Sequence, residues 1–187
     1  MDASFPGVID STRAVAMGDV DGDGDLDLLI GHTWGSDMLL INDGAGGFSV
    51  DTSFQQLVDT SLATTPSVWG VAMGDVDGDG DLDVLIGREL KANQLLINDG
   101  AGGFSVDASF PGGVANTHAV AMGDVDGDGD LDLLIGNNNA ANQLLINVAP
   151  PASRPPRRPV PRCHPHHARA GRRGWLQRGL QLSKWGR

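Results

Sequence analysis

Short apolar runs recur along the first 147 residues of the chain, and turn-forming residues separate them. The first full unit contains four such runs, at residues 15–18, 26–31, 38–42 and 48–51. Each run has the length of a short strand and is bounded by Gly, Asp or Asn, which favour turns. The pattern therefore predicts four short β-strands in each unit.

This unit is repeated. The nonapeptide DVDGDGDLD occurs three times, beginning at Asp19, Asp75 and Asp124. Four antiparallel strands repeated at about 40–60 residues are typical of propeller blades. We therefore predict an all-β fold: a partial β-propeller of about three four-stranded blades, the third incomplete. The expected blades are residues 14–51, 70–107 and 119–147, within one domain of residues 1–147.

Each nonapeptide carries five aspartates at alternate positions, whose charges would repel one another strongly without a cation. Oxygen ligands favour Ca²⁺, with side chains at positions 1, 3, 5 and 9, the carbonyl of position 7, and a turning Gly at position 6. We expect about three Ca²⁺ ions, one per loop; an acidic, solvated turn without an ion is the alternative. The predicted metal residues are Asp19, Asp21, Asp23, Asp25, Asp27, Asp75, Asp77, Asp79, Asp81, Asp83, Asp124, Asp126, Asp128, Asp130 and Asp132.

The loop does not match an EF-hand, which needs a bidentate Glu at position 12 and a helix on each side. Position 12 is Ile30, Ile86 or Ile135, and each isoleucine stands inside a strand-like run. The pattern therefore indicates a metal loop within a β-hairpin.

The stretches VAMGDVDGDGDLDLLIG and LLINDGAGGFSVD resemble the FG-GAP or VCBS repeat, the blade unit of integrin-α-like propellers. The resemblance covers residues 1–147. It implies a Ca²⁺ ion between the first two strands of each blade, an extracellular location (secreted or cell surface), and adhesion or ligand binding. The family commonly has seven blades, so further blades are expected to be missing from this chain.

The direction of the strands predicts two different faces. The metal loops and the NDGAGG turns fall at one end of the blades, whereas the residues that vary between copies fall at the other. Arg13, Trp69 and His118 precede the first strands, and Trp34 follows a second strand. We expect these four residues to bind a protein or carbohydrate ligand, because loops on a rigid scaffold often carry function. Neutral variation, or packing between blades, would also explain them.

Nothing within residues 1–147 indicates catalysis. The segment has no GxSxG or HExxH motif and no cysteine, and its only histidines are His32 and His118. We therefore expect a non-catalytic module rather than an enzyme. The alternatives are an accessory propeller portion of a secreted enzyme and a purely structural repeat array.

The charge of the chain divides sharply. All 24 acidic residues precede residue 148, with only three of the 13 basic residues, so the formal net charge of −11 conceals an acidic repeat region and a basic tail. Most of the acidity belongs to the metal loops, and it therefore does not indicate a basic partner. The sequence shows no signal peptide and no membrane-spanning run, and we expect no membrane insertion.

The Pro/Arg-rich tail, residues 148–187, is expected to be disordered because it has no periodicity and few core residues. A basic tail for nucleic acid or anionic lipid is one interpretation. We favour a frameshift, because residues 171–187 can be decoded one base out of frame into a copy of the repeat; no nucleic-acid partner is then expected. At the other end MDASFPG matches VDASFPG at residues 106–112, so the chain is expected to begin inside a fourth strand.

Overall fold

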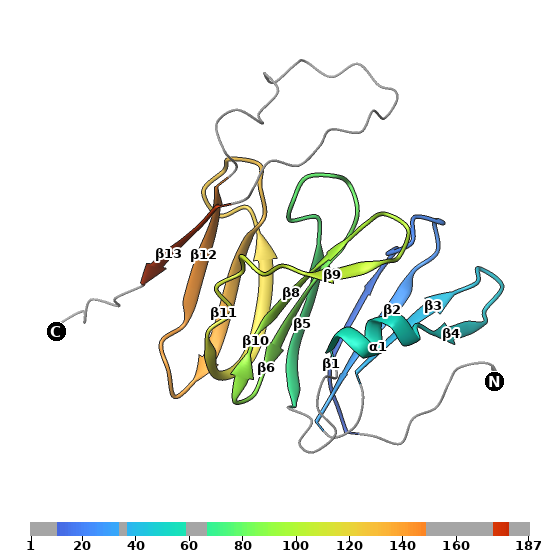
Figure 1. Ribbon diagram of the computed structural model, residues 1–187, viewed down its shortest axis with the longest axis horizontal. Helices are drawn as coiled ribbons and strands as arrows, with labels where there is room; N and C mark the ends of the chain where they lie inside the picture. The colour runs from blue at the N-terminus through green and yellow to red at the C-terminus, as the bar shows by residue number, and fades with distance from the viewer. Residues whose placement is uncertain (1–10, 34–36, 59–66, 149–173, 180–187) are drawn as a thin grey trace, which may run out of the picture.

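The computed structural model describes residues 11–33, 37–58, 67–148 and 174–179, and these residues form three consecutive antiparallel sheets (Figure 1). The first sheet has the order β1 (Thr12–Gly18), β2 (Asp27–His32), β3 (Met38–Asn42), β4 (Phe48–Val50). The second has the order β5 (Val68–Gly74), β6 (Asp83–Arg88), β8 (Gln94–Asn98), β9 (Phe104–Val106). The third contains β10 (Val114–Gly123), β11 (Asp132–Asn138), β12 (Gln143–Val148) and β13 (Gly174–Gly179), and the short β7 (Lys91–Ala92) pairs with β10.

Each sheet is a meander with the same register. The metal loop begins after a glycine that pairs with the ninth aspartate of that loop: Gly18 with Asp27, Gly74 with Asp83, and Gly123 with Asp132. The three sheets therefore repeat the arrangement of one blade. The prediction of an all-β, partial β-propeller is confirmed.

A helix, α1 (Thr52–Val58), lies between the first two blades and was not predicted. The Asp51 carboxylate caps it by accepting hydrogen bonds from the backbone N–H groups of Ser53 (2.8 Å) and Phe54 (3.2 Å). Phe54 and Val58, four residues apart on one helix face, are buried against the blades, and the Phe54 ring meets that of Phe104 edge to face at 5.5 Å. Among the described residues no helix is long and apolar enough to cross a bilayer.

Strand β13 corrects the expectation that the whole tail is disordered. Its six residues pair with β12 from Val148–Gly174 to Gln143–Gly179 and supply the fourth strand of the third blade. Pairing of this kind uses backbone groups, which every edge strand presents, so it needs no apolar pattern in the added segment. Most of the remaining tail lies outside the described residues. The frameshift hypothesis for residues 171–187 therefore stays a prediction.

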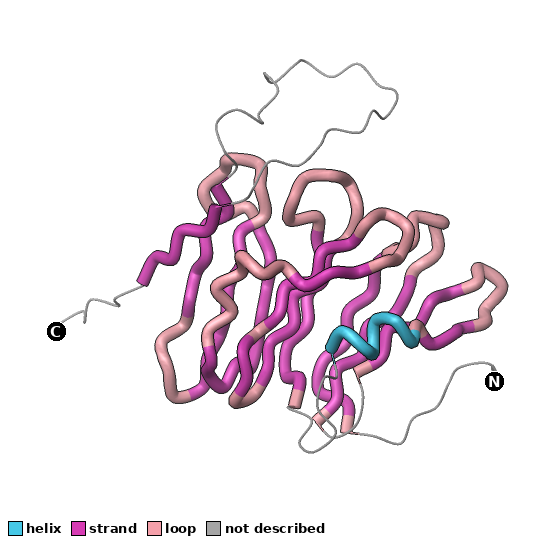
Figure 2. Tube along the Cα trace, in the orientation of Figure 1, coloured by secondary structure: helices cyan, strands magenta, loops and turns pink. Residues whose placement is uncertain are grey.

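The hydrophobic core lies between the blades rather than within one blade. One cluster joins the first and second sheets, and a second joins the second and third sheets. Because strand residues alternate between faces, Val84 and Ile86 enter the first cluster, whereas Leu85 enters the second. The central blade is therefore buried on both faces, and the tube in Figure 2 shows its strands between those of its two neighbours.

Leu85 and Leu134 occupy the same position of the repeat but differ in burial. Substituting each of them therefore tests whether packing between blades stabilises the fold. Leu85 is fully buried (0% exposed), whereas Leu134 of the third blade is 44% exposed. We predict that Leu85→Ala lowers the free energy of unfolding by about 2–5 kcal/mol, because it leaves a cavity between two sheets. Leu134→Ala should cost less than half as much in dilute solution. Urea denaturation of both variants measures the difference, and equal losses would contradict packing between blades.

Candidate metal centres

Three clusters of aspartates stand in the loops that join the first and second strands of the blades. In each cluster one carboxylate oxygen from each of three aspartates lies within 4.8 Å of the others. Oxygens bound to a single Ca²⁺ at about 2.3–2.6 Å lie no more than about 5 Å apart, so this spacing suits one shared cation. The clusters are Asp19, Asp21 and Asp27; Asp75, Asp77 and Asp83; and Asp124, Asp126 and Asp132.

The ninth aspartate of the loop is the buried member of each cluster. In the first blade one oxygen of Asp27 accepts the N–H of Val20 at 2.9 Å, and its other oxygen accepts the N–H of Asn42 at 2.9 Å. Asp83 and Asp132 make the same pair of bonds, with all four distances 2.9 Å. The carboxylate therefore closes its own loop and fixes the end of the third strand against it.

Burial also affects the charge of this residue. Desolvation raises the pKa of Asp27, and the neighbouring Asp21 and Asp23 carboxylates raise it further, while the hydrogen bonds from Asn42 and Val20 act in the opposite direction. Because the folded-state pKa is raised, the ionised carboxylate costs stability at neutral pH, and that cost is relieved as the pH falls towards the folded pKa. A cation at this position would oppose the same cost at neutral pH.

The first aspartate shapes the turn. Asp19 accepts hydrogen bonds from the N–H groups of Gly22 (2.8 Å) and Gly24 (3.0 Å). Both glycines have positive φ angles, 77° and 98°, which residues with a Cβ rarely adopt. The two invariant glycines are thus required by the loop that wraps around the Asp19 carboxylate.

Asp23 and Asp25, also predicted metal residues, stand outside the first three-residue cluster, as do their counterparts in the other loops. The Asp23 carboxylate accepts the N–H of Asp25 at 2.9 Å. The Asp25 side chain lies against Gly44 of the NDGAGG turn, where a Cβ atom would overlap it, and Asp81 lies in the same way against Gly100. The carboxylate of position 7 is thus turned towards the NDGAGG turn, and metal binding by its carbonyl stays a prediction.

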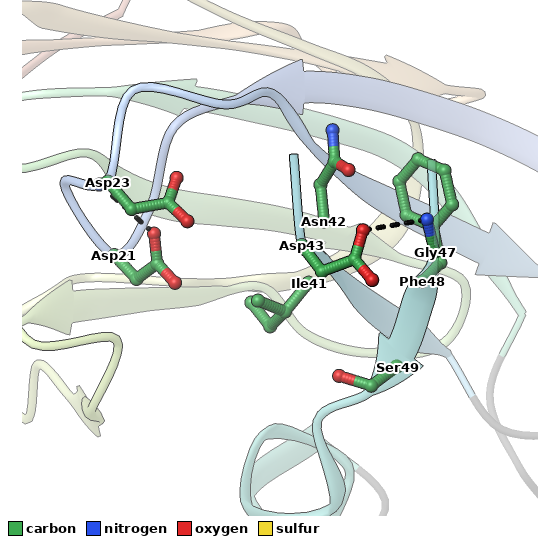
Figure 3. Close-up of a pocket in the computed structure, with 8 residues that line it drawn as sticks. All are labelled: Asp21, Asp23, Ile41, Asn42, Asp43, Gly47, Phe48 and Ser49. Carbon is green, nitrogen blue, oxygen red and sulfur yellow. Dashed lines mark hydrogen bonds between the residues drawn. The ribbon is translucent and has the colours of Figure 1, made fainter. Parts of the chain in front are cut away.

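A pocket of about 380 Å³ lies between the first metal loop and the turn of the same blade. Figure 3 shows Asp21 and Asp23 on one side of this pocket and Asn42, Asp43 and Phe48 on the other. Hydrogen bonds from the backbone of Gly47 and Ala45 lower the pKa of Asp43. The metal loop and the NDGAGG turn therefore share one end of the blade, as the strand directions predicted.

The residues of the opposite rim come together across the three blades. The rings of Trp69 and His118 stack at 4.4 Å with an interplanar angle of 14°, and the Arg13 guanidinium lies 4.7 Å from the centre of the Trp69 ring. Arg13 also donates a hydrogen bond to Thr33 at 2.7 Å. Their predicted common rim is confirmed, but each residue lies within a first strand, at a shift of register in β1, β5 or β10, and not in a loop before that strand. Ligand binding stays a prediction. Trp34 lies outside the described residues.

One repeat position near the metal loops, an asparagine in the third strand of the blade, was not predicted as functional. The side-chain amide of Asn98 donates to the Val20 carbonyl of the preceding blade at 2.7 Å, and Asn147 donates in the same way to Val76 at 2.7 Å. The signal was present in the sequence, because the asparagine stands at a constant distance from each metal loop. Among the described residues, the first and second metal loops are thus each held by the blade that follows.

The chain belongs to the FG-GAP-like repeat family. The family model matches residues 19–86 and, overlapping these, residues 75–135. Each match runs from one metal loop to the second strand of the next blade, and so includes one interface between blades. A search of curated proteins found no match.

Removal of a buried ninth aspartate should destabilise the chain even without metal. Asp83→Ala leaves the N–H groups of Val76 and Asn98 without their acceptor, at a cost of roughly 1–3 kcal/mol each. Asp79→Ala, in an exposed part of the same loop, is the matched control and should cost far less. Urea denaturation in excess chelator measures both losses, and equal stability of the two variants would show that the Asp83 bonds do not support the fold.

Proposed function

We propose that the chain is a calcium-binding propeller segment that acts as a non-catalytic adhesion or ligand-binding module of a secreted or cell-surface protein. The observation that carries the proposal is the threefold repetition of one carboxylate cluster with one geometry. Membership of the FG-GAP-like repeat family, whose repeats are typical of extracellular proteins, supports the location.

The donor set supports Ca²⁺ in preference to other metals. The three clusters contain carboxylates only, and hard oxygen ligands select Ca²⁺ or Mg²⁺ rather than zinc or copper. Ca²⁺ accepts six to eight oxygens in flexible geometry, whereas Mg²⁺ needs a near-octahedral shell and retains its waters. A loop that offers several carboxylates, one of them buried, matches the first requirement better. Such an ion would reduce the repulsion between the carboxylates of each loop. It would bind the folded chain and not the unfolded chain.

Calcium binding is tested by stoichiometry. We predict about three Ca²⁺ ions per chain by isothermal titration calorimetry, a higher melting temperature in Ca²⁺ than in chelator, and poor substitution by Mg²⁺. Asp21→Ala, which removes a cluster oxygen, should reduce the stoichiometry by one. Asp25→Asn is the matched control and should leave it unchanged, because its side chain is directed to Gly44. A melting temperature insensitive to Ca²⁺ would refute the proposal.

The ligand face in this proposal is the rim opposite the metal loops, formed by Arg13, Trp69 and His118. Arg13 and His118 are exposed, and together they present a cation and an imidazole to solvent. Trp69 is half-buried and its ring contacts both the His118 ring and the Arg13 guanidinium, so its role is to position the other two. A charged, hydrogen-bonding rim of this kind suits an acidic protein segment or a carbohydrate.

The proposed ligand face is tested by measuring ligand binding and the free energy of unfolding separately for each rim variant. On an array of glycans and extracellular-matrix proteins, Arg13→Ala and His118→Ala should weaken binding at least tenfold with unchanged calcium stoichiometry. Trp69→Ala should also lower the free energy of unfolding by about 1–2 kcal/mol, because it removes a ring stack and a cation–π contact. Thr12→Ala, an exposed neighbour, is the control. Binding retained by all three rim variants would exclude this face.

A further inference from the structure

The valine between the first two aspartates of a metal loop is fixed through both of its backbone polar groups. In the first loop Val20 stands between Asp19 and Asp21, which both belong to the carboxylate cluster. The Val20 N–H donates to Asp27 at 2.9 Å, and the Val20 carbonyl accepts the side-chain amide of Asn98 at 2.7 Å. Val20 is 2% exposed, so little water can reach either bond. The positions of Asp19 and Asp21 therefore depend on an asparagine of the following blade.

Asn98 also contacts the metal loop of its own blade. Its side-chain amide donates to the Leu82 carbonyl at 3.1 Å, and its backbone N–H donates to the Asp83 carboxylate at 2.9 Å. Its side-chain oxygen accepts the N–H of Gly100, in the NDGAGG turn, at 3.1 Å. Asn98 is itself only 2% exposed. One buried side chain thus joins the metal loops of two adjacent blades.

The second interface between blades repeats this arrangement. The Asn147 side chain donates to the Val76 carbonyl at 2.7 Å, and its backbone N–H donates to Asp132 at 2.9 Å. Val76 in turn donates its N–H to Asp83 at 2.9 Å. Asn147 and Val76 are as well buried as their counterparts, at 3% and 2% exposed. Each of these asparagines therefore connects the buried aspartate of its own blade with the loop of the preceding blade.

The chemistry of the position requires an asparagine. The amide nitrogen of Asn98 donates to two carbonyl oxygens, and its amide oxygen accepts one N–H. An ionised aspartate of the same size has no N–H to donate, and it would place a buried charge against both carbonyls. Serine has a single donor on a shorter side chain, so it could not make both contacts.

We infer that Asn98 and Asn147 are positioning residues, each shared by two adjacent metal sites, so that binding in one loop favours binding in its neighbour. The inference rests on the proposed calcium binding and adds that the sites are coupled. Hydrogen bonds behind metal ligands fix the orientation of those ligands, and removing them lowers metal affinity by about 10–100-fold. Ordering Asp83 fixes Asn98, which holds Val20 between two ligands of the first site. Such coupling is reciprocal.

The first experiment measures the Ca²⁺ affinity of the first loop alone by isothermal titration calorimetry. Asp77→Ala together with Asp126→Ala removes a cluster oxygen from the other two loops. In that chain Asn98→Ala should lower the affinity about tenfold or more, although it lies in another blade. Asn147→Ala is the matched control, because it removes the same contact from the next interface, and it should leave the affinity unchanged.

A chain that keeps only the third loop distinguishes positioning from a general loss of stability. Asp21→Ala together with Asp77→Ala gives this chain, and Asn98→Ala should not change its Ca²⁺ affinity. A loss at the third loop equal to that at the first would show a structural role only and overturn the inference. Asn98→Ser takes the place of Asn98→Ala if circular dichroism shows that the alanine variant does not fold.

The coupling is measured in a chain that keeps the first two loops and carries Asp126→Ala. The overall affinity for two Ca²⁺ ions should exceed the product of the two single-loop affinities by about fivefold or more, and Asn98→Ala should abolish this excess. Independent binding, or an excess that survives Asn98→Ala, would overturn the inference while leaving the proposed calcium binding intact. A wild-type chain that binds no Ca²⁺ would refute the proposed function, and the inference with it.

Discussion

The buried carboxylate at the ninth position of each metal loop is the interaction on which the rest of the structure depends. Asp27, Asp83 and Asp132 each accept one N–H from the loop and one from the end of the third strand. A buried negative charge is costly unless it is hydrogen-bonded or paired. The backbone donors meet part of that requirement, and a bound cation would meet the remainder. The same residue thereby closes the loop, stabilises the blade and contributes a ligand to the proposed metal site.

These carboxylates also belong to one hydrogen-bonded series that crosses the blades. Val20 donates to Asp27 and accepts from Asn98, which in turn donates its backbone N–H to Asp83. The step is repeated from Val76 through Asn147 to Asp132. At the opposite rim the stack of Arg13, Trp69 and His118 connects the same three blades. Each blade is therefore fixed to its neighbour at both ends of its strands, with the apolar core between.

Much of the fold could be predicted from the sequence, because each copy of the repeat contains apolar runs that predict strands and turn-forming residues that predict loops. The first two sheets follow the predicted apolar runs to within about three residues, whereas β10 of the third sheet begins at Val114, five residues before the expected blade. The aspartate clusters form where the nonapeptides stand. Three elements were not predicted: helix α1, the two-residue strand β7 and strand β13. Helix α1 is too short to show a clear periodicity in the sequence. Its apolar residues Phe54 and Val58 pack between two blades, and only the folded structure shows that contact. Strand β13 is defined by the free edge of β12 rather than by its own pattern.

The sequence by itself determined the blade, the turn glycines and the alternation of carboxylates, because these depend on local backbone geometry and spacing. Tertiary structure alone decided which aspartate is buried, and which face of each sheet is covered. It also decided that Trp69 stacks on His118 and contacts Arg13, within strand β5, rather than standing free on a loop. Identical sequences such as the three metal loops acquire different exposure, as Val76 and Val125 show, because burial depends on the neighbouring blade and not on the repeat itself.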